Sequence, residues 1–347
     1  MTVVENGAEW PILAVDLGGT QIRAALITPD RSVHCRRAVP TRDEEGVEAV
    51  LGRLADVASD VRDEAAASGL PPPIGIGISA PGPLDPWSGT VLTSPNLAGW
   101  TNVRIGPRIA SALGLPAFLE RDTNVAVMGE WRYGAAKEAL NAFYITVSTG
   151  IGGGIIIDGR PLVGTDGTAG EVGHLVVEID GPVCGCGGIG HVEAIASGTA
   201  LAREGKDLLE RRRDPAAPLA RLAADGAEVD AELVAKAALA GDQDCVAILE
   251  RAWVAIGAMC ASLVNLLDPQ VIVIGGSIAE HHPRLFDVAR DELTRRAFPI
   301  LLDRVRIVPA ALGGDVSLIG GLPIVNDRLD DPAYAPGSQP KQGALHP

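Results

Sequence analysis

The stretch PILAVDLGGTQIRAALI, residues 11–27, indicates how the chain folds. An apolar run ends at Asp16, a glycine pair follows, and a second apolar run starts at Ile22. This order predicts a β-hairpin of two strands joined by a tight turn. Glycines beside a hydroxyl and a carboxylate can bring backbone N–H groups against a phosphate while the carboxylate faces its magnesium. Taken alone, the pattern at residues 16–20 fits an ordinary hairpin turn equally well.

A second unit of the same kind follows about 130 residues later. Residues 143–147 are predicted to form a strand, residues 148–154 are rich in hydroxyls and glycines, and an apolar run resumes at Ile155. Two such units suggest an internal duplication, with two similar α/β domains that face each other over a phosphate.

The stretch GTDGTAGEVGHLVVEIDGPVCGCGGIGHVE, residues 164–193, carries a second kind of chemistry. Its ligand-type residues have the spacing His174-x9-Cys184-x-Cys186-x4-His191. Thiolates and imidazoles favour a tetrahedral Zn²⁺ over the oxygen-seeking Mg²⁺ or Ca²⁺. The alternative is a glycine-rich surface loop with two incidental cysteines. We expect a structural zinc.

Composition limits the class of protein. The chain has 347 residues, of which 47% are hydrophobic and 3% aromatic, which suits two domains with aliphatic cores. The formal net charge of −15 disfavours nucleic acids and anionic membranes as partners. The sequence shows no signal peptide and no uncharged apolar span of membrane length, and its five cysteines fit a reducing compartment. We therefore expect a cytoplasmic protein.

Helical periodicity predicts helices over residues 43–68, 122–132, 194–213, 242–267 and 315–325, with further helical segments within 214–240. Buried strands are expected at residues 74–78, 117–120, 271–274 and 305–308. Residues 275–277 open a helix where N–H groups can meet phosphate or ribose.

Two polar residues, Asp122 and Asn96, each allow two interpretations. Asp122 follows a strand and starts a helix, so it is either an N-cap or a general base. Asn96 lies in the loop SPNLAGW, residues 94–100, where it either stabilises a turn or hydrogen-bonds a polyhydroxyl ligand.

These motifs, in this order over residues 11–325, resemble the ROK family (repressors, uncharacterised frames and sugar kinases), and within it the bacterial ATP-dependent glucokinases. The residues that carry the resemblance are 16–20, 79–82, 94–100, 122 and 124, 149–154, 171–174, 184–187 and 193. The resemblance implies an actin-like ATPase fold of the hexokinase type: two α/β domains with a central cleft and a zinc-binding loop.

The resemblance also implies roles for individual residues. Asp122 would be the general base that takes the proton from the primary hydroxyl of a hexose. The other sugar hydroxyls would be held by Asn96, Glu171, His174 and Glu193. ATP and Mg²⁺ would be bound by Asp16, Gly18, Gly19, Thr20, Thr149 and Gly150, with Gly275 and Gly276 beside the adenosine. The structural Zn²⁺ would lock the loop that carries Glu171 and His174.

The chain departs from the family pattern at two positions. His191 stands where the family usually has a third cysteine, and imidazole can replace thiolate at a tetrahedral zinc. Arg121 stands where the sugar kinases usually have an asparagine that contacts the sugar. Since arginine is longer, charged and a donor only, the acceptor could be a modified hexose, an amino sugar or a cyclitol. If Arg121 instead points away from the cleft and pairs with a surface acid, glucose remains the expected acceptor.

For the domains we expect a smaller N-terminal α/β domain over residues 1–120, completed by a C-terminal helix at about 315–326. A larger domain with the zinc-binding loop would cover 121–314, and 327–347 would be a disordered tail. A homodimer is implied by the resemblance. A family repressor would carry an N-terminal helix-turn-helix of several tens of residues, and fifteen residues precede Asp16 here. A sugar-binding protein without catalysis is a third alternative.

Overall fold

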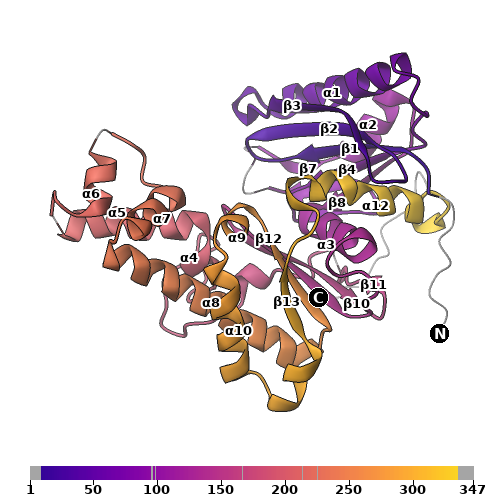
Figure 1. Ribbon diagram of the computed structural model, residues 1–347. Helices are drawn as coiled ribbons and strands as arrows, with labels where there is room; N and C mark the ends of the chain where they lie inside the picture. The colour runs from indigo at the N-terminus through magenta and orange to yellow at the C-terminus, as the bar shows by residue number, and fades with distance from the viewer. Residues whose placement is uncertain are drawn as a thin grey trace, which may run out of the picture. The chain divides into compact units, whose positions relative to one another are not determined.

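The computed structural model describes residues 9–94, 97, 99–165, 167–212, 214–224 and 226–334. The chain divides into two compact units (Figure 1). Unit 1 comprises Met1–Lys137, Pro161–Ala169 and Gly314–Pro347, and unit 2 comprises Glu138–Arg160 and Gly170–Gly313.

Unit 1 is built on a five-stranded sheet with the order β3-β2-β1-β4-β8. The predicted hairpin is confirmed, since β1 (Ile12–Leu17) pairs antiparallel with β2 (Gln21–Ile27) around the glycine turn. β3 (Val33–Pro40) extends the sheet beyond β2, and β4 (Ile76–Ala80) and β8 (Ala117–Arg121) run parallel to β1. β5 (Leu84–Asp85), β6 (Thr90–Thr93) and β7 (Thr101–Val103) form a small separate sheet.

Helices cover both faces of this sheet. α1 (Val47–Ala67) and α2 (Ile105–Leu113) lie on one face (Figure 1). On that face Leu54 and Val61 are fully buried in one apolar cluster with strand residues such as Leu13. α3 (Asp122–Tyr133), α11 (Val316–Ile319) and α12 (Gly321–Arg328) pack against one another and against the strands on the other face. The last two helices return from the end of the chain to complete the unit.

Unit 2 repeats the same plan. Its sheet has the order β11-β10-β9-β12-β13, formed by β9 (Ala142–Val147), β10 (Ile151–Ile157), β11 (Arg160–Pro161), β12 (Val271–Gly275) and β13 (Arg306–Pro309). β9 pairs antiparallel with β10 and parallel with β12, which is parallel to β13. In unit 1, β1 pairs in the same way: antiparallel with β2 and parallel with β4, which is parallel to β8. The topology therefore agrees with the duplication predicted from the glycine turns.

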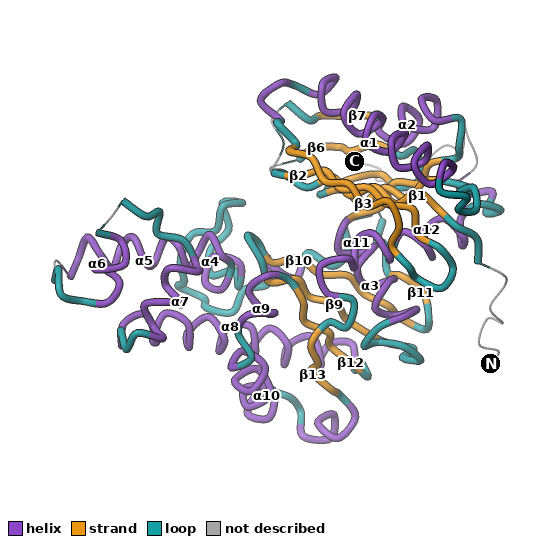
Figure 2. The backbone as a smooth tube through the Cα atoms, turned by 45° about the horizontal axis from the view of Figure 1, so that its top comes forward, coloured by secondary structure: helices purple, strands orange, loops and turns teal. Residues whose placement is uncertain are grey.

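The helices of unit 2 form a large core layer and a smaller group (Figure 2). α8 (Gln243–Leu267) and α10 (Arg284–Arg296) pack together, and Trp253 and Ile256 of α8 lie in one core with Phe143. α5 (Gly198–Arg212), α6 (Pro218–Ala223) and α7 (Ala231–Leu239) gather around a second apolar cluster with the start of α8. α4 (Glu193–Ala196) and α9 (Ser277–His281) are single short turns.

α8 is long and apolar enough, by length and composition, to cross a membrane. More than half of its most apolar window is buried inside unit 2. The apolar face that gives the high hydropathy is therefore the face that packs on the sheet, as in the core helix of a globular domain.

The structure differs from the sequence expectation in the domain boundaries and in the order of the C-terminal segment. Pro161–Ala169 belongs to unit 1, although the second domain was expected to cover residues 121–314. α3 belongs to unit 1, whereas the second domain was expected to start at residue 121, because α3 packs against α11 and α12. The expected disorder from residue 327 onward does not hold for residues 327–334. There Arg328 is buried and pairs with Glu120, and the Tyr334 ring lies 4.3 Å from the Arg328 guanidinium carbon. Residues 335–347 lie outside the described part of the chain.

The buried pair of Glu120 and Arg328 provides a test of how unit 1 is held together. Arg328→Met should lower the free energy of unfolding by about 3–5 kcal/mol, because it leaves the Glu120 carboxylate buried without its cation. Arg304→Met, the same change at an exposed position of unit 2, serves as the control. Thermal unfolding followed by circular dichroism measures both variants. Equal midpoints would show that the chain end contributes nothing to unit 1.

Candidate active site

The carboxyl ends of three parallel strands form one edge of the unit 1 sheet. Asp16 on β1 lies opposite Ser79 on β4, and Ser79 lies opposite Glu120 on β8. Asp122 follows two residues later as the first residue of α3. Ligands of open α/β sheets bind at this edge, and here it carries both Asp16 and Asp122.

Asp122 does not have the geometry of a helix N-cap. The N-cap position of α3 is Arg121, whose side chain makes no capping bond. The Asp122 side chain is exposed, and its Oδ1 accepts the N–H of the adjacent Thr123 at 2.7 Å. The carboxylate is therefore accessible to a ligand.

Asp16 is held by an arginine that sequence reasoning missed. Asp16 is 8% exposed, and its Oδ2 accepts hydrogen bonds from Nε and Nη2 of Arg23 at 3.0 and 2.6 Å. Arg23 also donates to the Gly314 carbonyl and to Ser317 Oγ, which lie at the start of the returning C-terminal segment. The signal was available, because a tight turn after Leu17 puts Arg23 directly across the hairpin from Asp16, where opposite charges attract.

The first glycine turn is tight and its end is open to solvent. The Gly18 N–H donates to the Gln21 carbonyl at 2.9 Å, and Thr41 Oγ1 donates to the Gly18 carbonyl at 2.7 Å. Gly18 and Gly19 are half-buried, and Thr20 is exposed. Such a turn can present backbone N–H groups to an anion. Asn96, the expected sugar contact, lies outside the described residues.

Arg121 is enclosed within unit 1. Its side chain is 4% exposed and donates through Nη2 to the Ala169 carbonyl and, at 3.4 Å, to Asn124 Oδ1. The guanidinium thus lies inside the protein beside the start of α3, and not at the surface.

The second glycine turn follows β9 in unit 2 and lies beside the carboxyl end of β12, the parallel neighbour of β9. Thr149 is exposed and Gly150 half-buried, directly after β9. Gly275 ends β12 opposite Thr146, and Ser148 Oγ lies 3.0 Å from Ser277 Oγ. The four expected nucleotide contacts of unit 2 (Thr149, Gly150, Gly275 and Gly276) therefore share one edge of its sheet.

Gly276 illustrates why this edge is glycine-rich. Its φ is +93°, and a Cβ there would lie 2.6 Å from the Val147 carbonyl oxygen. Any other residue would be strained and would push the turns that follow β9 and β12 apart.

Glu193 connects the second glycine turn to the cysteine–histidine loop. Its Oε2 accepts the N–H of Ile151 at 2.9 Å, and its Oε1 lies 3.7 Å from Cys184 Sγ. A Cβ on Gly150 would come within 2.8 Å of the same carboxylate. The residue expected to contact a sugar thus also fixes the turn expected to bind phosphate.

The four predicted metal ligands come together in the structure. One ligand atom each of His174, Cys184, Cys186 and His191 lies within 4.8 Å of all the others. Burial raises the pKa of the Cys184 thiol, so a cation is needed to keep that sulfur ionised near neutral pH. Two thiolates and two imidazoles at this separation fit a tetrahedral zinc.

The loop around this cluster is shaped by backbone hydrogen bonds. The Cys184 N–H donates to the Gly188 carbonyl at 2.7 Å, and the Gly187 N–H donates back to the Cys184 carbonyl at 2.9 Å. Bridges pair Val176 with His191 and Val183 with Ile189. These bonds bring both cysteines next to the histidines without any long helix or strand.

The two ring nitrogens of His174 face different groups. Nδ1 lies 3.8 Å from Cys184 Sγ, and Nε2 lies 4.0 Å from Glu171 Oε2. Glu171 is exposed. Nδ1 is thus directed to the other residues of the cysteine–histidine cluster, and Nε2 faces the exposed carboxylate of Glu171.

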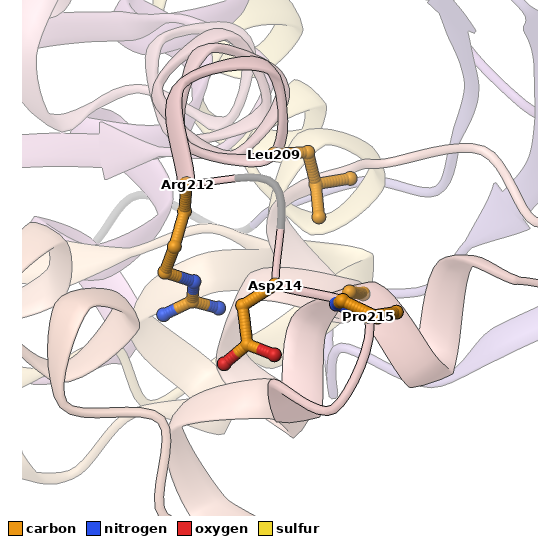
Figure 3. Close-up of a pocket in the computed structure, with 5 residues that line it drawn as sticks. Leu209, Arg212, Asp214 and Pro215 are labelled. Carbon is orange, nitrogen blue, oxygen red and sulfur yellow. The ribbon is translucent and has the colours of Figure 1, made fainter.

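A pocket of about 380 Å³ elsewhere in unit 2 is lined by an arginine that is already paired with two carboxylates. It is lined by Leu209, Arg212, Asp214, Pro215 and Ala220 (Figure 3). The Arg212 guanidinium donates to both Asp242 oxygens at 2.8 and 2.6 Å and to Asp244 at 2.8 Å. The same bonds lower the pKa of Asp242 to about 2, so this arginine is neutralised within the helical group.

Two α/β units of matching topology, each with a glycine turn at the carboxyl edge of its sheet, define the actin-like ATPase fold. The ROK family model matches residues 12–328, so the chain belongs to the ROK family.

Similar proteins include a glucokinase of Thermotoga maritima, 32% identical over 92% of this chain and 98% of the relative. The ROK hexokinase of Thermus thermophilus is 33% identical with a TM-score of 0.76, covering 92% of this chain and 99% of that one. A ROK family glucokinase from Streptomyces griseus, solved in complex with glucose and AMPPNP, is 30% identical with a TM-score of 0.77, covering 91% and 99%.

The metal cluster can be tested by elemental analysis. The purified protein should contain about one zinc per chain, and Cys184→Ser should lose it, because the hydroxyl is a poor substitute for a thiolate at zinc. Cys260→Ser, at a buried cysteine outside the cluster, should keep the metal. Protein purified without chelators but free of zinc would refute the site.

Proposed function

We propose that this protein transfers the γ-phosphoryl group of ATP to the primary hydroxyl of a hexose, most simply glucose, with Asp122 as the general base. The chain is an ATP-dependent phosphotransferase of the sugar-kinase class, as its similarity to glucokinases and a ROK hexokinase supports. The acceptor, the base and the individual contacts are our proposal.

The observation that carries the proposal is the position of Asp122 in unit 1. An exposed carboxylate stands at the edge of the sheet where β1, β4 and β8 end, the edge that also presents Asp16 and the first glycine turn. A base for an alcohol and a phosphate-binding turn on one sheet edge are what phosphoryl transfer to a hydroxyl requires.

In the proposed reaction, Asp122 accepts the proton of the primary hydroxyl as its oxygen forms a bond to the γ-phosphorus. The bond from that phosphorus to the bridging oxygen breaks, and ADP leaves with the electron pair. The glycine turns after β1 and β9 would hold the phosphates by their N–H groups. Mg²⁺, held by the nucleotide on the side of Asp16, would neutralise the charge that develops on the phosphate oxygens.

The sugar would be oriented by the groups beside the metal cluster. Glu171, the Nε2 side of His174 and Glu193 offer acceptors and a donor for ring hydroxyls, and Asn96 would add an amide. Zinc would have no part in the chemistry; it would fix the loop from which Glu171 and His174 project.

A second acceptor class remains within the proposal. An amino sugar, another modified hexose or a cyclitol with a primary hydroxyl would use the same base and the same donor. The position of Arg121 inside unit 1 supports the neutral hexose as the first choice. Homodimer formation and a cytoplasmic location stay predictions.

The general base is tested by Asp122→Asn. This variant should lose about 100- to 10,000-fold in kcat, because the amide cannot accept the proton, while the KM for Mg-ATP changes little. The assay measures ADP release from Mg-ATP with glucose, mannose, N-acetylated and amino hexoses, fructose and cyclitols.

Asp63→Asn, the same change at an exposed residue of α1, is the matched control and should keep wild-type rates. Equal turnover of Asp122→Asn and wild type would exclude Asp122 as the base. If wild type turned over no acceptor at all, the kinase proposal itself would fail and sugar binding without catalysis would replace it.

A further inference from the structure

Arg121 is a buried cation directly beside the proposed base. It ends β8, and its neighbour Asp122 begins α3. Burying a guanidinium is costly unless several acceptors surround it. The hydrogen-bond acceptors of Arg121 therefore indicate which parts of the protein its side chain holds together.

The first acceptor belongs to the start of α3. Arg121 donates to Asn124 Oδ1 at 3.4 Å, and Asn124 Nδ2 donates in turn to Glu120 Oε1 at 2.9 Å. Glu120 also pairs with Arg328 of α12. Arg121 is thus one member of a buried polar chain that runs through unit 1, and its orientation is set by partners that are themselves fixed.

The second acceptor belongs to a distant part of the chain. Arg121 donates to the carbonyl oxygen of Ala169, 48 positions later. Ala169 ends the short segment Pro161–Ala169, which belongs to unit 1 although the chain on both sides of it belongs to unit 2. Glu171, a proposed sugar contact, follows two residues after Ala169.

This segment is closed by a hydrogen bond of its own and approaches the rest of unit 1 closely. The Ala169 N–H donates to the Val163 carbonyl at 3.1 Å, which closes a turn. Gly167 has a φ of +80°, and a Cβ there would lie 2.6 Å from the Leu84 carbonyl oxygen, so the backbones approach closely. The bond from Arg121 fixes the exit of this turn, where the chain leaves for Glu171 and His174.

We propose that Arg121 is a positioning residue, which ties the end of the Pro161–Ala169 segment to the strand that carries the base and so sets where the Glu171–His174 segment begins. The proposal rests on the proposed kinase function and narrows its acceptor. With its guanidinium bonded inside unit 1, Arg121 is not the counter-ion of a substrate, so its presence at this position gives no reason to expect a phosphorylated or carboxylated sugar in place of a neutral hexose.

The first test is hydrogen exchange on the protein without ligands, so it does not depend on catalysis. Arg121→Asn, with a side chain too short to reach Ala169, should speed exchange of the Ala169 amide at least about tenfold, because the turn it closes loses its anchor. In Arg121→Lys the exchange rate of the Ala169 amide should lie between those of Arg121→Asn and wild type. Arg108→Asn, which removes an equally charged but exposed side chain of unit 1, should match wild type.

Peptides from α8 serve as the internal reference for global stability. If Arg121→Asn also speeds exchange in the α8 peptides, Arg121→Lys, which keeps the positive charge and one donor group, is compared with wild type instead. Exchange at Ala169 that is unchanged in both variants would overturn the positioning role.

The second test is kinetic. In Arg121→Asn, kcat/KM for the hexose should fall about 10- to 100-fold with partial recovery in Arg121→Lys, while the KM for Mg-ATP stays near wild type. An increase of the hexose KM with unchanged exchange at Ala169 would make Arg121 a direct substrate contact and refute the proposal. Wild type that prefers an anionic sugar would refute the narrowed acceptor class. A failure of the kinase function would be distinguishable. The wild-type protein would then turn over no acceptor, while exchange of the Ala169 amide would still be faster in Arg121→Asn.

Discussion

The buried ion pair of Glu120 and Arg328 joins the sheet of unit 1 to the returning end of the chain. Glu120 lies near the carboxyl end of β8, the edge strand of the unit 1 sheet, and Arg328 lies in α12, which returns from the other end of the chain. Both side chains are buried, so neither charge is tolerated without the other. The same carboxylate accepts the Arg121 and Asn124 N–H groups, which couples the closing of the unit to the residues on either side of Asp122.

Parallel strands impose the second constraint. Their carboxyl ends meet at one edge, so residues that are distant in sequence reach a common surface without any further device. In unit 1 this brings Asp16 near the strand that leads to Asp122, and in unit 2 it brings the turn after β9 next to Gly275. Each of the two sheets therefore carries one glycine turn at its carboxyl edge.

Local features of this site could be predicted from the sequence. The hairpin around residues 16–20, the glycine turn after residue 147 and the convergence of His174, Cys184, Cys186 and His191 all follow from residue types at short spacing. The partners of Arg121 and Glu120 could not be predicted, because a hydrogen bond to Ala169 or to Arg328 depends on tertiary packing across 48 and 208 positions. The order of residues 327–334 was missed for the same reason, since composition there suggests a polar tail.

The segment from Glu171 to Glu193 shows what the proposed zinc would contribute to the stability of the chain. Among the residues described there, regular structure amounts to one 3₁₀ turn, two isolated bridges and the first residue of α4, and Ile179 and Val183 are 86% and 64% exposed. Burial of apolar surface alone would not order such a loop against its conformational entropy. Four bonds to the proposed zinc would supply the order that apolar burial does not. Because Glu193 reaches from the cysteine–histidine cluster to the Ile151 N–H, that order would extend to the second glycine turn.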